Sequence, residues 1–488
     1  MVAQRAVNRV DSAWWVALRL ALVLVTLVAV GWLLAQAPLR YLLVALGGLI
    51  GAALLFRHPW LGLCGLAVAV PFGPLAAISV GPIQIGPSEL LLVATLSVWY
   101  LRGAAGQAHP LRLGGLAAAI GVTVLIALIS SYRATQLGAA AQDLAKWVGL
   151  GVVMLYASSQ LAPRQIGWVL AALLVGGAAQ GVLGVFQFAS QRGPEAFQLL
   201  GRYMRAHGTF GQPNPYAGYL GLLLPLGLTL PVSLVVGRRE RHWSTWALAG
   251  LAATCAACIG AGVVLSWSRG ALLAAMVAVA MLLLAAGKRA RMAALVAVVL
   301  ALALGPWLVG LTPQGIAERL VGGLQLLGAE LSSIEVTDAN FAMIERLAHW
   351  TAAWRMFEQH PWLGVGLGQY AAVYPEVAIA RWADPLGHAH NMYLHVLGEQ
   401  GLLGAVGLAF FFLGGLAATW KGIKQCTGWR RAVVLGCWGM LWHLAVHSVV
   451  DLLFVQGIYL LVGLVLGLMI AVQQQEGTTV GSHHHVDL

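Results

Sequence analysis

A histidine followed by an asparagine, with two glycines at a fixed distance behind them, is the pattern in this chain that is best suited to chemistry. His390 and Asn391 precede Gly401-Leu-Leu-Gly404 by nine residues, where a polar loop runs into an apolar stretch. A neutral imidazole takes a proton from a hydroxyl group, and the positive N-terminal end of a following helix disfavours the imidazolium. We therefore predict His390 as a general base, with His388 as a weaker competitor. Asn391 is either the N-cap of that helix or an acceptor ligand.

Arginine residues form the second candidate site. Their guanidinium forks match phosphate oxygens, which favours a phosphate-bearing ligand. Arg269 lies in a short turn before Gly270, which permits close approach of a bulky group. We predict Arg269 and Arg346 as phosphate ligands. Arg202 and Arg205 are weaker candidates, whose alternative role is contact with lipid headgroups.

The sequence predicts no metal and no cofactor. The 17 acidic residues are scattered, and no Asp-x-Asp occurs among them. The five cysteines include Cys255-x-x-Cys258, but this pair lies in an apolar stretch where small thiols pack. The histidines at 483–485 are excluded as a tail.

The apolar content indicates which elements carry these residues. Hydrophobic residues make up 60% of the 488 residues and charged residues 9%. The apolar runs are about 20 residues long, the length of a helix that crosses a hydrocarbon core. They lack the alternation of membrane strands, and a bare backbone finds no water at that depth. The sequence predicts an all-α, polytopic integral membrane protein with about 12 to 14 transmembrane helices. Hydropathy places the spans near 13–36, 41–56, 60–79, 88–102, 113–131, 145–158, 166–189, 216–236, 245–265, 270–287, 292–310, 392–419, 432–450 and 454–472.

Hydropathy divides the chain into five parts. These are N-terminal spans at 1–190, central spans at 191–310, a large outer loop at 311–391, C-terminal spans at 392–473 and a tail at 474–488. The first span, 13–36, is longer than a signal-peptide core, and Pro38 follows its cleavage-like end, which predicts an uncleaved anchor. Prolines and glycines interrupt the apolar run from Pro71 to Ser88, so we expect a broken helix there.

Basic loops orient the spans, because short loops rich in Lys and Arg stay in the cytoplasm. Three such loops, around Arg238, Lys288 and Lys424, fall on one side. The opposite side then carries the segment 190–215, the Ser268-Arg269-Gly270 turn and the loop 311–391. Topology and attraction to membrane lipids explain the net charge of +11, so nucleic acid is not expected as a partner.

The large outer loop is predicted to contain a helix. Its apolar stripe consists of Met343, Leu347, Trp350, Trp354 and Phe357. Their spacing of three and four places them on one face of a helix that Pro361 ends. Such a helix can lie on the bilayer surface or roof a cavity. The glycines at 364, 366 and 368 follow no strand, so they predict a turn that folds the loop back.

In order and spacing, these motifs resemble the O-antigen ligase and polymerase superfamily. The resemblance rests on Ser268-Arg269-Gly270, Arg346-x-x-x-Trp350 with its following proline and glycines, and His390-Asn391-x9-Gly401-x-x-Gly404. The segment from His207 to Asn214 also resembles one that such proteins carry before a central span. The similarity covers roughly residues 200 to 455, and the N-terminal spans match in hydropathy alone.

The resemblance implies a GT-C-like membrane glycosyltransferase that takes a glycan from undecaprenyl, or another polyprenyl, diphosphate. The acceptor it implies is lipid A-core oligosaccharide on the periplasmic face of the inner membrane. The family's essential residues carry over to Arg269, Arg346 and His390. Arginines then replace a cation at the diphosphate, His390 deprotonates the acceptor hydroxyl, and inversion at the sugar is expected. Acceptor binding or support is assigned to Asn391, Tyr393, Asn214 and His388.

Other functions stay open beside this ligase. A polymerase would join polyprenyl-linked repeat units, and a glycan-to-protein transferase would use the same chemistry. A lipid-linked oligosaccharide transporter is disfavoured, because the spans hold few charges and show no internal repeat. His447 and Asp451 lie four residues apart on one helix face, which we interpret as a buried polar pair.

Overall fold

The computed structural model describes residues 38–80, 83–107, 109–199, 203–236, 242–288, 335–336, 340–379 and 381–483, and a few positions between 15 and 25. It divides into two compact units, Met1–Leu61 and Gly62–Leu488. The first contains helix α2 (Leu39–Arg57), which matches a span expected from hydropathy. The spans predicted at 13–36, apart from a few positions, and at 292–310 lie outside the described residues.

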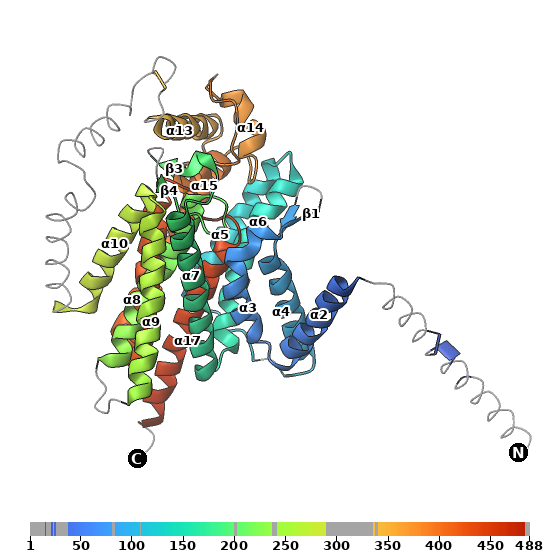
Figure 1. Ribbon diagram of the computed structural model, residues 1–488. Helices are drawn as coiled ribbons and strands as arrows, with labels where there is room; N and C mark the ends of the chain where they lie inside the picture. The colour runs from blue at the N-terminus through green and yellow to red at the C-terminus, as the bar shows by residue number, and fades with distance from the viewer. Residues whose placement is uncertain are drawn as a thin grey trace, which may run out of the picture. The chain divides into compact units, whose positions relative to one another are not determined.

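The second unit is a bundle of helices with two very short hairpins (Figure 1). Its first half contains α3 (Leu61–Ala69), η1 (Val70–Leu75), β1 (Ile78–Val80), β2 (Ile83–Ile85), α4 (Pro87–Ala104), α5 (Gly115–Ser130), η2 (Ser131–Arg133), α6 (Leu137–Gln160) and α7 (Pro163–Ser190). Its second half contains η3 (Glu195–Phe197), β3 (Gln198–Leu199), β4 (Tyr203–Met204), α8 (Pro213–Val235), α9 (Trp243–Leu265), α10 (Arg269–Ala286), α13 (Phe341–Gln359), α14 (Tyr370–Val377), α15 (Met392–Gln425), α16 (Gly428–His447) and α17 (Ile458–His483).

Seven of the described helices are long and apolar enough to cross a membrane. They are α5 with its η2 extension, α7, α8, α9, α10, α15 and the Ile458–Glu476 part of α17. Helices α4, α6 and α16 fall on three further predicted spans. The protein is therefore an all-α, multi-pass membrane protein, as the apolar runs predict.

The predicted span at 60–79 is wrong as a continuous helix. Helix α3 ends at Ala69, and a 3-10 turn with two prolines leads into the antiparallel β1–β2 hairpin, in which Ile78 pairs with Ile85. Proline has no backbone N–H to continue the helical ladder, so the chain breaks there. The expectation of a broken helix in this region is thus correct, with strands beyond the break.

Helix α8 lies in the interior of the bundle, in contact with α7, α9, α10 and α16. Small residues let such helices approach closely, because lipid provides little apolar driving force for their association. Gly181 of α7 is one example: a Cβ atom there would lie 2.2 Å from the carbonyl oxygen of Cys258 on α9. Cys255 and Cys258 are both free, which agrees with a packing role.

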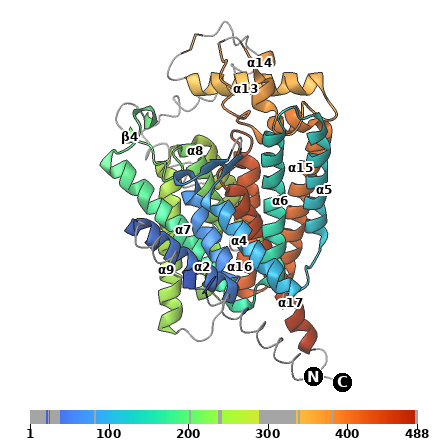
Figure 2. The same cartoon turned by 90° about the vertical axis from the view of Figure 1, so that its right-hand side faces the viewer.

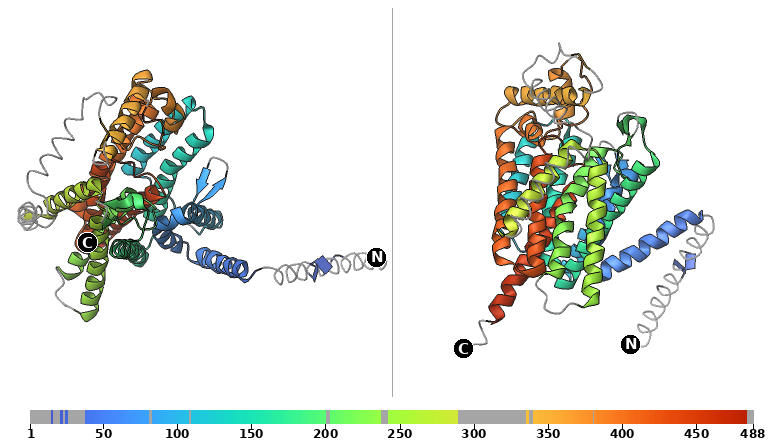
Figure 3. Two further views of the ribbon diagram at one scale, coloured as in Figure 1. Left: turned by 45° about the horizontal axis from the view of Figure 1, so that its top comes forward. Right: turned by 60° about the vertical axis from the view of Figure 1, so that its left-hand side comes forward.

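Helices α13 and α14 lie across one end of the bundle, above the start of α15 (Figures 2 and 3). Helix α13 confirms the helix predicted in the outer loop, but the face it packs is different. Its fully buried residues, which pack against α14 and the adjoining segments, are Ile344, Ala348, Ala352, Ala353 and Met356. Leu347 of the predicted stripe is buried, whereas Trp354 is 44% exposed. The large side chains of the aromatic stripe predicted that this face would be packed. In the structure the small alanine side chains on another face let α13 approach Tyr370 and Tyr374.

A kink in α15 at Gly401 joins this helix to the glycine-rich turn. Gly401 has φ 62° and ψ −156°, and a Cβ there would lie 2.4 Å from the backbone of Trp362. Gly364 approaches the backbone of Glu399 equally closely, and the N–H groups of Val365 and Gly366 donate to carbonyls of α15. Only glycine fits such contacts. Gly401 and Gly364 therefore form a close contact between α15 and the glycine-rich turn, which we call the clasp and which holds the loop on α15.

Candidate active site

His390 lies immediately before α15, in a strained backbone conformation. Its φ of 49° falls in the left-handed region, which a non-glycine residue adopts only when its surroundings enforce it. Asn391 follows as the N-cap: its Oδ1 accepts the backbone N–H of Tyr393 at 2.9 Å and of Leu394 at 3.0 Å. The capping role predicted for Asn391 is confirmed. The cap fixes the start of α15 and therefore the position of His390 just before it.

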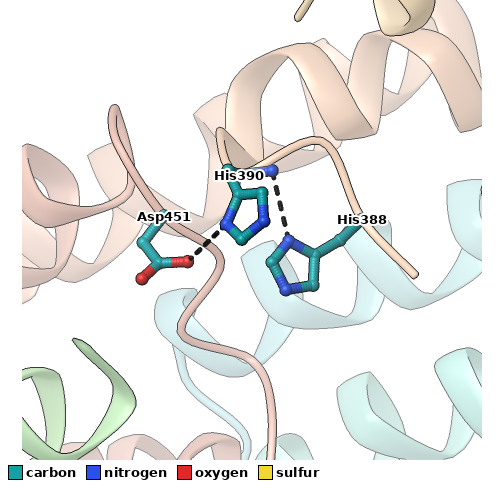
Figure 4. A group of neighbouring side chains, drawn as sticks. All are labelled: His388, His390 and Asp451. Carbon is teal, nitrogen blue, oxygen red and sulfur yellow. Dashed lines mark hydrogen bonds and ion pairs between the residues drawn. The ribbon is translucent and has the colours of Figure 1, made fainter. Parts of the chain in front are cut away.

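The imidazole of His390 faces Asp451, which lies in the segment between α16 and α17 (Figure 4). Its Nδ1 is 3.4 Å from the Asp451 carboxylate. The backbone N–H of His390 donates to Nδ1 of His388 at 3.2 Å. Because a carboxylate only accepts, the proton of a neutral His390 ring resides on Nδ1. Nε2 then carries the lone pair, and within the described residues it has no hydrogen-bond partner.

Burial and neighbouring charges set the protonation of the groups around His390. Burial acts to raise the pKa of Asp451, but the hydrogen bond from His390 and the nearby histidines outweigh it and lower the pKa to about 2. Burial, then the charge of His390, lowers the pKa of His388 to about 3 and that of His349 to about 4. At neutral pH, Asp451 is therefore charged, and His388 and His349 are neutral.

Helix α13 covers this site and holds it in place. The indole Nε1 of Trp350 donates to the carbonyl oxygen of His390 at 3.4 Å. His349 contacts the ring of His390 edge to face at 5.8 Å, and its Nδ1 lies 3.0 Å from the hydroxyl of Tyr370. The Arg346-x-x-x-Trp350 spacing thus places Trp350 on the backbone of His390 and Arg346 one helical turn away.

Arg205 lies where β4, α8 and the turn before α10 meet. Its Nε donates to the carbonyl oxygen of Ser266 at 2.9 Å, and its Nη2 donates to Oδ1 of Asn214 at 3.3 Å. Burial, followed by the charges of Arg346 and Arg269, lowers its pKa to about 10.

These three arginines come from separate parts of the chain, yet they lie close enough for their charges to act on one another. Arg269 is exposed at the start of α10. Nε of Arg346 is buried and, within the described part of the chain, has no hydrogen-bond partner. Mutually repelling cations at one place indicate a site for an anion.

The remaining predicted residues fall in different places. Asn214 supports Arg205, as described above. The hydroxyl of Tyr393 donates to the carbonyl of Ala445 at 2.8 Å, so it joins α15 to α16. Arg202 lies outside the described residues.

Asp451 is the residue that the sequence analysis missed. His447 and Asp451 are both buried, as expected, but the carboxylate of Asp451 contacts His390, and its backbone N–H donates to the carbonyl oxygen of His447. Sixty-one positions separate it from His390. The one signal in the sequence was a carboxylate just beyond the outer end of an apolar span, where an unpaired charge is costly.

His388, His390 and Asp451 also have the composition of a cation site. One ligand atom from each lies within 4.8 Å of the others. Two imidazoles and a carboxylate suit a transition metal such as zinc. The same lone pair of His390 can either accept a proton or bind a metal ion. A chelator distinguishes the two roles, because it stops the reaction only if the metal is needed.

The fold and these two groups of side chains define a multi-pass membrane protein with a covered histidine–carboxylate pair beside an arginine cluster. Residues 253–409 match the family model described as O-antigen ligase. The chain thus carries a domain of the O-antigen ligase superfamily. The matched segment runs from α9 into α15 and includes Arg269, Arg346 and His390, whereas Asp451 lies beyond it. No curated protein matches the chain.

Proposed function

We propose that this protein transfers a glycan from a polyprenyl diphosphate to a hydroxyl group of lipid A-core oligosaccharide on the periplasmic face of the inner membrane. The observation that carries the proposal is the geometry of His390, whose Nδ1 faces a charged carboxylate and whose Nε2 is left to accept a proton. The match to a family described as O-antigen ligase supports the substrate class.

In the proposed step, the acceptor oxygen attacks the anomeric carbon of the donor sugar. The new C–O bond forms as the bond between that carbon and the diphosphate oxygen breaks. The hydroxyl proton passes to Nε2 of His390, and the diphosphate leaves with the bonding electron pair. Asp451 holds the proton on Nδ1 and stabilises the imidazolium that forms, as a carboxylate does for histidine in other acid–base sites.

The leaving diphosphate needs positive charge, which the arginines supply. Arg205, Arg269 and Arg346 repel one another in the absence of an anion, so a diphosphate relieves that repulsion and gains charge-assisted hydrogen bonds. Arg346 also lies one turn from Trp350, which contacts His390. Helix α13 therefore connects the anion site with the base. The reaction is proposed to need no metal.

The test is a transfer assay with the purified, full-length protein in lipid nanodiscs. A defined polyprenyl diphosphate glycan is offered with lipid A-core, with a second polyprenyl-linked glycan, or with a protein acceptor, each with and without EDTA. We expect product with lipid A-core at an unchanged rate in EDTA. Product with the polyprenyl-linked acceptor alone would identify a polymerase. Activity lost in EDTA and restored by a divalent metal would assign His388, His390 and Asp451 to a cation.

A further inference from the structure

Three aromatic side chains from separate elements stand parallel to one another next to the arginine cluster. They are Phe188 near the end of α7, Tyr203 in β4 and Trp267 in the turn before α10, and we call them the aromatic ladder. The rings of Phe188 and Tyr203 are 6.2 Å apart with planes 2° apart, and those of Tyr203 and Trp267 are 6.5 Å apart at 18°. All three side chains are partly exposed.

The ladder is joined directly to the arginine site. Tyr203 and Arg205 are two residues apart at the end of β4, and Met204 between them is fully buried. Arg205 donates to the carbonyl of Ser266, and Tyr203 stacks on the adjoining Trp267. Arg269 follows two residues later. Trp267 in the turn and Arg269 at the start of α10 therefore place an aromatic ring next to an arginine.

The backbone of Trp267 is in a strained conformation. Its φ is 54°, in the left-handed region, which a bulky side chain adopts only when the surroundings hold it there. Glycine would adopt this turn without strain. Such strain is typical of residues that present a side chain to a ligand.

The position of the aromatic ladder along the bundle determines which part of a lipid-linked donor the ladder can contact. Trp267 lies between the end of α9 and the start of α10, and Phe188 lies in the last turn of α7. These are the ends of three candidate spans, the depth of a lipid headgroup and not of its hydrocarbon chain. At that depth the donor consists of its diphosphate and its first sugars.

On the basis of the proposed function, we propose that the aromatic ladder binds the first sugar of the donor, the one attached to the diphosphate. The C–H bonds on one face of a pyranose are weakly positive and pack on the negative face of an aromatic ring. Tyr203 stacks between Phe188 and Trp267, so the outer face of Trp267, at the end of the ladder, is the one offered to the sugar, and Tyr203 holds the Trp267 ring in place. The ladder then contributes to selection of the first sugar, while Arg205, Arg269 and Arg346 hold the diphosphate.

The experiment compares two ligands in the full-length protein: a polyprenyl diphosphate without sugar, and the same lipid with one hexose. Binding is measured for wild type, Tyr203→Ala, Trp267→Ala and the aromatic replacements Tyr203→Phe and Trp267→Phe. Trp243→Ala, at the opposite end of α9 and 79% exposed, is the matched control. We expect each alanine variant to lose about three- to tenfold in affinity for the hexose ligand, with little change for the sugar-free lipid. The aromatic replacements should restore most of it.

The outcomes separate this inference from the proposed function. An equal loss for both ligands would assign the ladder to the lipid or to the support of Arg205, and it would overturn the sugar site. No loss for either ligand in the alanine variants would make the ladder a packing feature, which also overturns it. If wild type neither bound the sugar-free lipid nor transferred a glycan, the proposed function itself would fail.

Discussion

Two histidines near the start of α15, His390 and His395, each face a carboxylate, and the surroundings of the two pairs differ. His390 is 3.4 Å from Asp451, and Nε2 of His395 is 3.6 Å from Glu399. The carboxylate of Glu399 accepts the backbone N–H of Gly368 at 2.9 Å and that of Tyr370 at 2.8 Å, one on each oxygen. Glu399 therefore fastens the glycine-rich turn to the kinked helix.

Exposure separates the two pairs further. The side chain of His390 is 20% exposed and precedes the helix, whereas that of His395 is 10% exposed, inside α15 and packed on Tyr370. Asp143 lies near the second pair and forms an ion pair with Lys146 at 2.5 Å. We therefore propose that the same residue types make a reactive site at His390, whose Nε2 has no hydrogen-bond partner among the described residues, and a structural lock at Glu399, where backbone donors occupy the carboxylate.

The largest difference between the pairs is expected on removing each histidine. His390→Ala should lower the transfer rate by about 10²- to 10⁴-fold and leave donor affinity nearly unchanged, because a base acts on the barrier and not on ground-state binding. His395→Ala should keep the turnover of the folded protein. The measurement is kcat together with donor binding. Wild-type turnover in His390→Ala would remove this histidine from the mechanism.

The carboxylates give the second contrast. Asp451→Asn keeps the size of the side chain but removes the charge that holds the proton on Nδ1 of His390, so we expect a loss in kcat of about 10²-fold or more. Glu399→Gln should instead lower the unfolding temperature, because the amide nitrogen cannot accept a backbone N–H. Thermal unfolding and kcat are measured on both variants. Unfolding of Asp451→Asn with full activity in its folded fraction would reverse the two assignments.

The arginine cluster should respond in both affinity and rate. Arg269→Lys and Arg346→Lys keep the charge but lose the fork that grips phosphate oxygens, so donor affinity should fall by about tenfold and turnover should fall with it. Lys424→Arg, in the last turn of α15 on the side predicted to be cytoplasmic, is the control. Titration with a polyprenyl diphosphate is the measurement. Equal affinities of wild type and both lysine variants would leave these arginines as headgroup anchors.

The clasp is tested through its glycines. Gly401→Ala should destabilise the fold by about 1–3 kcal/mol or more, because alanine at φ 62° is strained and its Cβ meets the backbone of Trp362. Gly428 has a similar φ of 54° but nothing within 4 Å, so Gly428→Ala isolates the backbone strain, about 1 kcal/mol. Chemical unfolding in detergent measures both. Equal losses would show that the contact with Trp362 contributes nothing.

The smallest effect is expected from His388 in a pH profile. Asp451, with a pKa of about 2, and His388, with a pKa of about 3, do not titrate between about pH 5 and 8. Acid protonates the base, so the rate should fall as the pH decreases, and His388→Gln should leave that decrease where it is. The profile of kcat against pH is recorded for both proteins. A decrease that disappears in His388→Gln would make His388 the base.

The sequence by itself determined the elements and several local contacts. Apolar runs placed the described spans, because a helix in lipid must be apolar over its whole length. The outer helix before Pro361 and the Asn391 cap also followed from nearby residues, since spacing and capping act within a few positions. The turn predicted at Ser268-Arg269-Gly270 lies just before these residues, and Arg269 begins α10. The β1–β2 hairpin did not follow, because an apolar run of that length does not distinguish a broken helix from strands.

Only the tertiary structure decided which distant residues meet. Asp451 reaches His390 because α16 packs against α15, and Arg205 joins Arg269 and Arg346 because a hairpin, a turn between spans and a loop helix converge. The packed face of α13 was likewise set by its neighbours, which accept alanines at Ala348 and Ala352 and leave Trp354 outside. Hydropathy and spacing report the preferences of one segment. Contacts between segments depend on which surfaces fit together, and no single segment contains that information.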